Sequence, residues 1–186
     1  MEEINVRELI EDNIYTILAN EYNELLLDYV LLSFNDEYCG QESHKKVVIE
    51  AILIFNTRKR VGNSLEHPYF YVDENKMCCV KYSIEDFFCD SEHWGDITSS
   101  FSESYMTYWR AFSDQPYPTT YSKEDFYRIN DLLFPIQFRN ELEIYIWNDE
   151  FSNYFDDGKD WWGTALWSVY DKQMNRFVII GASLSD

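Results

Sequence analysis

The stretch TALWSVYDKQMNRFVIIGASL, residues 164–184, decides the fold. Apolar and β-branched side chains fill residues 164–170 and 176–184, which is typical of strands, and the polar run DKQMN between them is typical of an exposed turn. Just upstream, LEIYIW at residues 142–147 alternates aliphatic side chains with Glu, Tyr and Trp, as a half-buried strand does. These three segments predict an antiparallel sheet that ends in a β-hairpin.

Helix signals lie upstream of that sheet. In residues 1–37, apolar side chains recur at spacings of three and four, which predicts an amphipathic helix or a pair of helices joined near residues 20–23. Residues 102–112 also favour a helix. The motif Ser122 to Asp125 is a weak variant of the capping box, so we expect a further helix that begins there and ends before Pro135.

Other segments leave alternatives open or resemble connections. The run VVIEAILIF lies within residues 45–57, and its length suits a buried helix as well as a buried strand. Residues 69–72 and 78–82 are predicted as short strands, and residues 114–122, DQPYPTTYS, as an irregular surface connection. We therefore expect one α+β domain over residues 1–186, with N-terminal and central helices packed mainly on one side of a mainly antiparallel sheet.

The chain is strongly acidic and rich in aromatic residues. Its 186 residues hold 34 Asp plus Glu against 15 Lys plus Arg, a formal net charge of −19, together with 6 Trp, 15 Tyr and 13 Phe. A disordered acidic chain is poor in aromatic residues, so we expect a folded protein. Duplex DNA and anionic membranes attract Lys and Arg, so we expect neither a direct nucleic-acid partner nor a membrane partner. Nearly half of the excess, ten acids against one base, lies in residues 1–37.

The sequence favours a cytoplasmic location with reduced, mostly buried cysteines. No apolar run approaches the ~18 residues of a transmembrane helix, and residues 1–12 lack the basic and apolar regions of a secretory signal. The neighbours Cys78 and Cys79 make a possible zinc set with Cys89 and His93. Because C-C-x9-C-x3-H is not a familiar ligand spacing, we expect no metal, and no other cofactor is indicated.

The segment NDEFSNYFDDGKDWWG, residues 148–163, concentrates acids and large aromatic residues between two predicted strands. Loops that a rigid sheet positions often carry function, and aromatic residues beside fixed charges supply anchors for a partner. The plainer interpretation is that the Trp residues complete the core and that the acids are solvated around Gly158. The candidate partner-binding residues are Asp149, Glu150, Tyr154, Asp156, Asp157, Asp160, Trp161 and Trp162.

Catalytic motifs are missing from the sequence. His44, His67 and His93 stand in no recognised motif, and there is no nucleophile elbow, zinc-protease motif or phosphate-binding glycine loop. We therefore expect a protein that is not an enzyme. The enzymatic alternative is a carboxylate-dependent hydrolase that uses residues 149–160. A structural or self-associating protein is a third hypothesis, and the sequence leaves the oligomeric state open.

The leading hypothesis follows from the charge. A field of this sign steers basic proteins toward the chain, and basic proteins are typically nucleic-acid enzymes. We therefore expect an acidic cytoplasmic protein that inhibits a basic partner, such as a toxin or a nucleic-acid enzyme. Its most concrete forms are a bacterial immunity protein that neutralises a nuclease-type toxin and an anti-defence or DNA-mimic inhibitor.

Overall fold

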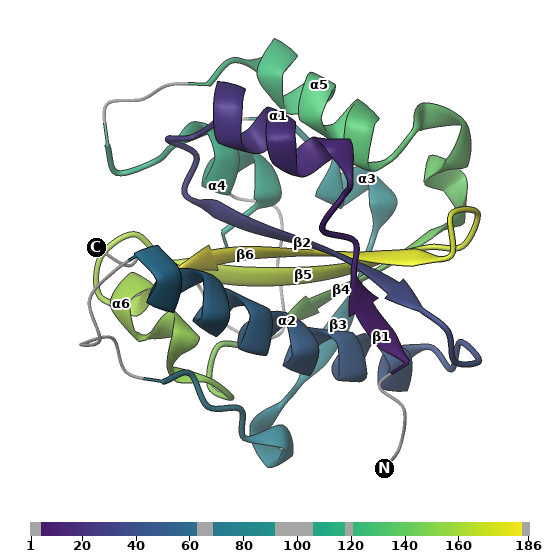
Figure 1. The fold of residues 1–186 in the computed structure, drawn as a ribbon. Helices are drawn as coiled ribbons and strands as arrows, with labels where there is room; N and C mark the ends of the chain where they lie inside the picture. Colours follow the sequence, from purple (N-terminus) through teal and green to yellow (C-terminus); the bar gives the residue numbers. More distant parts are fainter. Residues whose placement is uncertain (1–4, 63–68, 92–105, 118–120, 184–186) are drawn as a thin grey trace.

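Six strands form one antiparallel sheet in the order β1-β2-β6-β5-β4-β3 (Figure 1). The computed structural model describes residues 5–62, 69–91, 106–117 and 121–183. The predicted α+β class and the C-terminal hairpin, made by β5 and β6, are confirmed. The strands are β1 (Val6–Glu8), β2 (Leu27–Phe34), β3 (Cys79–Tyr82), β4 (Leu142–Trp147), β5 (Thr164–Asp171) and β6 (Arg176–Ser183).

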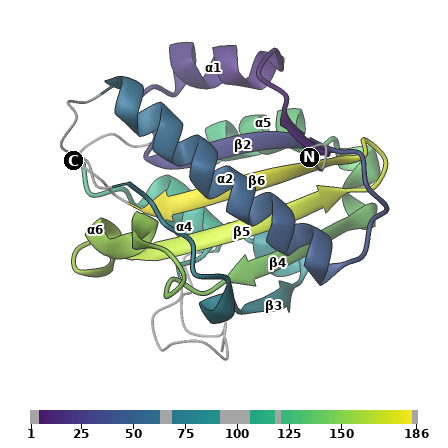
Figure 2. The same ribbon diagram turned by 60° about the horizontal axis from the view of Figure 1, so that its bottom comes forward.

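Helices cover both faces of this sheet (Figures 1 and 2). The expectation that they pack mainly on one side is wrong. β6 is buried along its whole length. Its apolar side chains run continuously instead of alternating with polar ones, which is typical of a strand that other elements cover on both faces. One face carries α1 (Asn13–Glu21), α3 (Ile84–Phe87), α4 (Tyr108–Ser113) and α5 (Lys123–Leu133), and the other carries α2 (Gln41–Gly62) and α6 (Asp156–Lys159). Short 3-10 turns lie at Glu74–Lys76, Ile136–Glu141 and Asn153–Phe155.

The turn of the β5–β6 hairpin follows from its sequence. Asp171 Oδ1 accepts hydrogen bonds of 3.0 Å from the backbone N–H groups of Gln173 and Met174. Asn175 has a φ of 47°, a left-handed conformation in which Asn is enriched. These local contacts close the hairpin in the register that places Asp171 opposite Arg176.

The N-terminal segment holds one helix between two strands, so the predicted helix or helix pair is only partly right. Asp12 caps α1 by accepting a 3.0 Å hydrogen bond from Ile14 N–H. The sequence after α1 forms β2, in which successive residues such as Tyr29 and Val30 enter opposite cores. LDYVLLSF at residues 27–34 is apolar at most positions, so its side chains also match the three- and four-residue spacing of a helix, although the segment is a strand.

The run VVIEAILIF lies in a helix, which settles the alternative for residues 45–57. α2 buries apolar side chains at intervals of three and four against the sheet, as an amphipathic helix does. Neither α2 nor any other helix within the described residues is both long and apolar enough to cross a membrane. The buried residues of α2 in this core are Val47, Val48, Ala51, Ile52 and Phe55.

Residues 69–72 are extended, but they belong to none of the six strands in the described part of the chain, so the strand predicted there is wrong. The side-chain amide of Asn153 takes the place of a neighbouring strand, donating a 3.1 Å hydrogen bond to Tyr69 O and accepting one of 2.9 Å from Tyr71 N–H. The alternation that suggested a strand is real, since Phe70 is buried and Tyr69 and Tyr71 are exposed. The side chain of Asn153 therefore makes the backbone hydrogen bonds that the sequence pattern predicts to come from a neighbouring strand.

The other predicted strands are confirmed. β3 and β4 occupy the predicted residues 78–82 and 142–147 with at most one residue of difference. Of the helix predicted for residues 102–112, the structure shows the part that begins at Tyr108, which is α4. Residues 102–105 lie outside the described residues.

The predicted capping box at the start of α5 is confirmed. Asp125 N–H donates a 3.2 Å hydrogen bond to Ser122 Oγ, and Ser122 N–H donates one of 2.8 Å to Asp125 Oδ2. α5 ends at Leu133, as expected for a chain that reaches Pro135 two residues later.

The cysteines are free thiols, but they are not mostly buried as expected. Cys39 and Cys78 are exposed, and Cys79 and Cys89 are half-buried. Burial raises the pKa of Cys79 to about 12. Within the described ranges no three His, Cys, Asp or Glu side chains are grouped to hold a metal. His93 lies outside those ranges, so the four-residue zinc set is not tested.

Tyr154 ties the loop before β5 to the centre of the sheet. Its ring lies 5.1 Å from the ring of Phe55 on α2, and its hydroxyl donates a 2.7 Å hydrogen bond to Asp28 Oδ2 on β2. Gly181 on β6 leaves the space for that hydroxyl, because a Cβ added there would lie 2.4 Å from Tyr154 Oη. The contact therefore requires glycine at position 181.

We expect Gly181→Ala to lower the free energy of unfolding by about 1–3 kcal/mol, because the methyl group overpacks the core against Tyr154. Tyr154→Phe removes the hydroxyl and its hydrogen bond, at a cost of about 1 kcal/mol. In the double variant the clash with Oη is gone, so the total cost should be about 1 kcal/mol smaller than the sum. Urea unfolding of the four proteins measures this coupling, and additive costs would contradict it.

Candidate functional site

Residues 148–163 form the loop that connects β4 to β5. Ser152 Oγ accepts a 3.1 Å hydrogen bond from Tyr154 N–H, which starts the helical part of the turn. Gly163 N–H donates a 2.8 Å hydrogen bond to Gly158 O, and Gly163 has a φ of 115°, which favours glycine. Hydrogen bonds within the chain thus fix the shape of this loop before any partner binds.

The aromatic half of the loop is buried. Tyr154 and Trp162 are at most 9% exposed, and Trp162 Nε1 donates a 2.7 Å hydrogen bond to Asp114 O. Phe151 and Phe155 lie fully buried with Tyr154 in the core under α2. Tyr154 and Trp162 therefore lie in the core, and for Trp162 this is the plainer interpretation of the sequence.

The acidic half of the loop faces solvent. Glu150, Asp156, Asp157 and Asp160 are all exposed. Lys159 is the base among them, with Nζ 3.6 Å from Glu150 Oε1 and 4.0 Å from Asp156 Oδ1. Four carboxylates against one ammonium leave this turn with a net negative charge.

One aromatic side chain of the loop, Trp161, is exposed beside these acids. It is 56% exposed, and the partly exposed ring of Tyr117 stands edge-on to it with centroids 5.9 Å apart. Asp149 is half-buried and accepts a 2.7 Å hydrogen bond from Thr164 Oγ1, so it braces the base of the loop. We define the acidic aromatic patch as Glu150, Asp156, Asp157, Asp160, Trp161 and Tyr117.

Sequence reasoning missed three exposed aromatic residues near this loop, namely Tyr69, Tyr71 and Tyr117. Tyr69 and Tyr71 are held against the loop by the side chain of Asn153. Their alternation with the buried Phe70 could have identified them as outward-facing. Tyr117 carries no comparable signal, because its position depends on a contact with Trp161 from a distant part of the chain.

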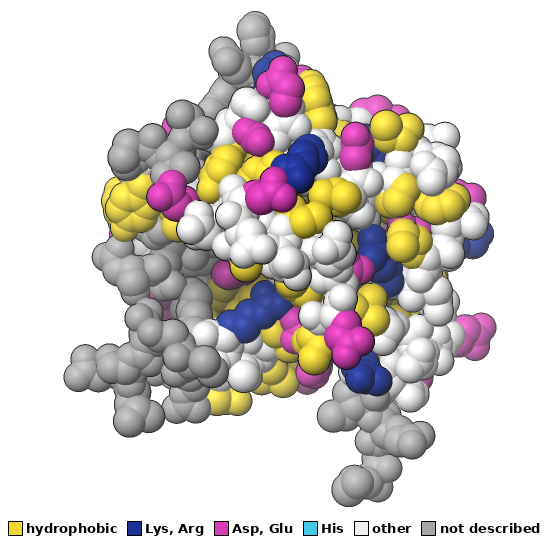
Figure 3. All heavy atoms as spheres, turned by 45° about the horizontal axis from the view of Figure 1, so that its top comes forward, with side chains coloured by type: hydrophobic (Ala, Val, Ile, Leu, Met, Phe, Trp, Pro, Cys, Tyr) yellow, Lys and Arg dark blue, Asp and Glu magenta, His cyan; other side chains and the backbone are white. Residues whose placement is uncertain are grey.

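The acids of the N-terminal segment are distributed differently. The face that carries α1 and α5 mixes acidic, basic and apolar side chains (Figure 3). Several of the acids on residues 5–37 pair with bases, so part of the negative charge of that segment is neutralised locally. These pairs are Glu8 with Arg58, Asp12 with Arg176, Glu21 with Arg128 and Asp36 with Lys46.

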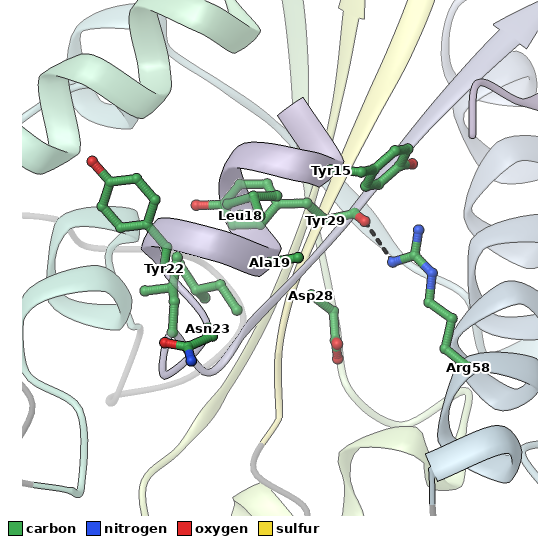
Figure 4. Close-up of a pocket in the computed structure, with 10 residues that line it drawn as sticks. Tyr15, Leu18, Ala19, Tyr22, Asn23, Asp28, Tyr29 and Arg58 are labelled. Atoms are coloured by element: carbon green, nitrogen blue, oxygen red, sulfur yellow. Dashed lines mark hydrogen bonds between the residues drawn. The ribbon is translucent and has the colours of Figure 1, made fainter. Parts of the chain in front are cut away.

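A cavity of about 280 Å³ lies between α1, β2 and the C-terminal part of α2 (Figure 4). Asp28 is the carboxylate in its lining, and no residue of 148–163 lines it. The exposed acids of the loop are not among the residues that line this cavity. This cavity lends no support to a hydrolase that uses residues 149–160, and that alternative stays a prediction.

A chain of polar groups crosses the core under α2. His44 Nδ1 and Trp147 Nε1 lie 2.7 Å and 2.8 Å from Ser168 Oγ. Tyr38 Oη lies 3.0 Å from the other ring nitrogen of His44. Burial lowers the pKa of His44 to about 3, so the ring is neutral at pH 7. His44 and Ser168 are fully buried, and this serine and histidine therefore form a structural hydrogen-bond network that is closed to substrates.

Comparison with protein-family models, with curated proteins and with solved structures finds no match for this chain. The function therefore has to be argued from the chemistry of its own surface. Two of the eight predicted partner-binding residues, Tyr154 and Trp162, lie in the core, and Asp149 braces the base of the loop. The other five are exposed on the loop, namely Glu150, Asp156, Asp157, Asp160 and Trp161.

Because Trp162 is buried and Trp161 is exposed, replacing the one should destabilise the protein much more than replacing the other. Trp162→Ala should lower the free energy of unfolding by about 3–5 kcal/mol, because it empties a buried site and leaves Asp114 O without its indole donor. Trp161→Ala should cost less than about 1 kcal/mol, because the side chain is mostly exposed. Chemical denaturation measures both costs, and similar values for the two variants would refute the division.

The His44 network predicts a pH dependence of stability. The unfolded chain binds a proton at His44 below pH ~6.5, whereas the folded chain does so only near pH 3, so stability is fully present above pH ~6.5 and falls as the pH decreases toward 3. Between pH 7 and pH 5 the wild type should lose about 2 kcal/mol more than His44→Gln. Urea unfolding at both pH values tests this, and parallel losses in the two proteins would show that His44 is not buried as a neutral ring.

Proposed function

We propose that this protein binds and inhibits a basic protein partner through the acidic aromatic patch. The observation that carries the proposal is Trp161, which is 56% exposed on the turn that also presents four exposed carboxylates. Tryptophan is enriched among the residues that dominate binding energy at protein interfaces. An exposed indole among acids is therefore suited to an apolar contact surrounded by charge pairs with Lys or Arg of a partner.

Charge supports fast and selective association with such a partner. The net charge of −19 attracts basic proteins over distances comparable to the Debye length, about 8–10 Å at physiological salt. Electrostatic attraction of this kind raises association rates and disfavours acidic partners. The acids outside the patch thus contribute to steering, and those within it lie where contact occurs.

The rigidity of the loop supports the same function. Ser183 Oγ donates a 2.7 Å hydrogen bond to Tyr154 O, and the buried rings of Tyr154 and Trp162 hold the two ends of the acidic turn. A surface that is ordered before binding loses little conformational entropy in the complex. The core residues of the loop therefore favour affinity without touching the partner.

The partner class that fits best is a nucleic-acid enzyme, whose active surface is basic because it holds phosphates. The carboxylates of the patch would stand in the places of phosphates, and Trp161 would supply the apolar anchor. We infer a cytoplasmic immunity protein against a nuclease-type toxin, or an anti-defence or DNA-mimic inhibitor, that binds the enzyme and not DNA itself.

Neutralising the patch should abolish inhibition. The test co-expresses the protein with each basic nuclease-type protein encoded beside its gene and scores cell survival and binding at low salt. The wild type should protect cells, and the quadruple variant should bind its partner at least about tenfold more slowly and lose protection. That variant is Glu150→Gln, Asp156→Asn, Asp157→Asn and Asp160→Asn.

A matched control separates the patch from bulk charge. Four exposed acids outside the loop are neutralised, which gives the same net charge of −15, and this protein should still bind and protect. Equal loss in both quadruple variants would mean that only total charge matters. A wild type that binds no basic protein at low salt would overturn the proposal. The control is Glu11→Gln, Glu42→Gln, Glu85→Gln and Glu124→Gln.

A further inference from the structure

Two exposed aromatic side chains, Trp161 and Tyr117, form a corner within the acidic aromatic patch. Trp161 is 56% exposed and Tyr117 is 42% exposed, and their rings stand at 89° to each other with centroids 5.9 Å apart. In such an edge-to-face pair, one ring contacts the other without covering its whole face. The face of an aromatic ring carries partial negative charge and attracts cations. The exposed part of this aromatic corner can therefore take a positively charged group.

The helical turn α6, which lies beside the end of β6 (Figure 2), supplies carboxylates next to the corner. Asp160 continues the right-handed helical backbone after α6, and Trp161 N–H donates a 3.3 Å hydrogen bond to Gly158 O. Asp157 precedes Asp160 by three residues and Trp161 by four, and side chains at these spacings are neighbours on a helical surface. Both carboxylates are exposed, so the indole of Trp161 shares its face of the turn with two acids.

The base of this turn is engaged with other acids. Lys159 Nζ lies 3.6 Å from Glu150 Oε1 and 4.0 Å from Asp156 Oδ1. Among the ion pairs of the described residues, none involves Asp157 or Asp160. Like charges at such a helical spacing repel each other, so a cation that binds between these two carboxylates relieves that repulsion. The charge beside the aromatic corner is thus complementary to a cation seated on the indole.

Arginine suits this arrangement better than lysine does. The guanidinium group is planar and weakly hydrated, so it stacks on an aromatic face while the N–H groups at its edge bind carboxylates. The ammonium group of lysine is compact and strongly hydrated, and it acts as a point charge. A ring face flanked by two carboxylates therefore favours a guanidinium group over an ammonium group of the same charge.

We propose that the aromatic corner binds an arginine side chain of the basic partner. The guanidinium group stacks on the exposed face of Trp161, Tyr117 forms the second wall, and the N–H groups donate to Asp157 and Asp160. Proteins that hold nucleic acids carry such arginines, because the guanidinium fork matches phosphate geometry. The inference rests on the proposed function for the existence of a basic partner, and it adds which side chain of that partner meets the indole.

The test compares two synthetic capped peptides of equal charge, in which Gly alternates with four Arg residues or with four Lys residues. NMR titration at low salt follows the indole N–H signal of Trp161, which is assigned by its loss in Trp161→Leu. The wild type should bind the Arg peptide about threefold more tightly than the Lys peptide. The ring protons of Trp161 should also show nuclear Overhauser effects to the Arg side chains.

Three variants locate the contact, and circular dichroism checks that each keeps its fold. Trp161→Leu should remove the preference for Arg while both peptides still bind by charge, as followed by backbone amide signals. Asp157→Asn with Asp160→Asn should weaken binding of the Arg peptide about threefold. The matched control, Glu85→Gln with Glu124→Gln, has the same net charge of −17 and should keep both the affinity and the preference.

Equal affinities of the wild type for the two peptides, or failure of the Arg peptide to bind at low salt, would overturn the inference. A preference for Arg that survives in Trp161→Leu, or equal losses in the two double variants, would also overturn it. The proposed function is scored separately by cell survival. A wild type that protects cells but binds the two peptides equally contradicts only the arginine contact, and a preference for Arg without protection contradicts only inhibition.

Discussion

Burial of the β5–β6 hairpin on both faces is the constraint on which the rest of the structure depends. Every residue of β6 is buried, so the sheet is stable only with an apolar layer on each side. Arg176, at the end of the hairpin, joins the sheet to the helices of one face, α1 and α5. Its guanidinium donates a 2.7 Å hydrogen bond to Leu133 O at the end of α5 and one of 3.1 Å to Asp12 Oδ2 at the start of α1. α1 and α5 are thus also fixed to the hairpin by charge-assisted hydrogen bonds.

The candidate site follows from the same constraint. The loop between β4 and β5 inserts its aromatic residues into the layer under α2, and Tyr154 reaches Asp28 over Gly181. Burying these rings leaves the carboxylates of Glu150, Asp156, Asp157 and Asp160 on the outer side of the turn. The exposure of Trp161 beside the burial of Trp162 results from one tight turn closed by Gly158 and Gly163. The acidic surface is therefore held in shape by the hydrophobic core.

Much of the fold is predictable from local patterns. The strand at residues 142–147, the hairpin and the capping box at Ser122 each depend on neighbouring residues, and all are confirmed. The predictions that were wrong involve distant contacts. Residues 69–72 are bonded by the side chain of Asn153 and belong to no strand of the described chain, whereas residues 27–34 form a strand because β6 pairs with them. The continuous apolar run of β6 did carry a signal for two covered faces.

The candidate site was predictable as a segment but not residue by residue. Composition located residues 148–163, but which ring is buried depends on contacts with α2 and with Asp114, which lie far away in sequence. The same holds for Tyr117, which approaches Trp161 only in the folded chain. The cavity at β2 had no local signal either, because three elements form its walls.

The central claim is that the acidic aromatic patch, and not the bulk negative charge, contacts a basic partner. Carbodiimide labelling of carboxylates, read by mass spectrometry with and without the bound partner, tests it most directly. The account predicts strong protection of Glu150, Asp156, Asp157 and Asp160 in the complex, with exposed acids such as Glu85 and Glu124 labelled as in the free protein. Uniform protection of all exposed acids, or protection of Glu85 and Glu124 with the loop still labelled, would contradict it.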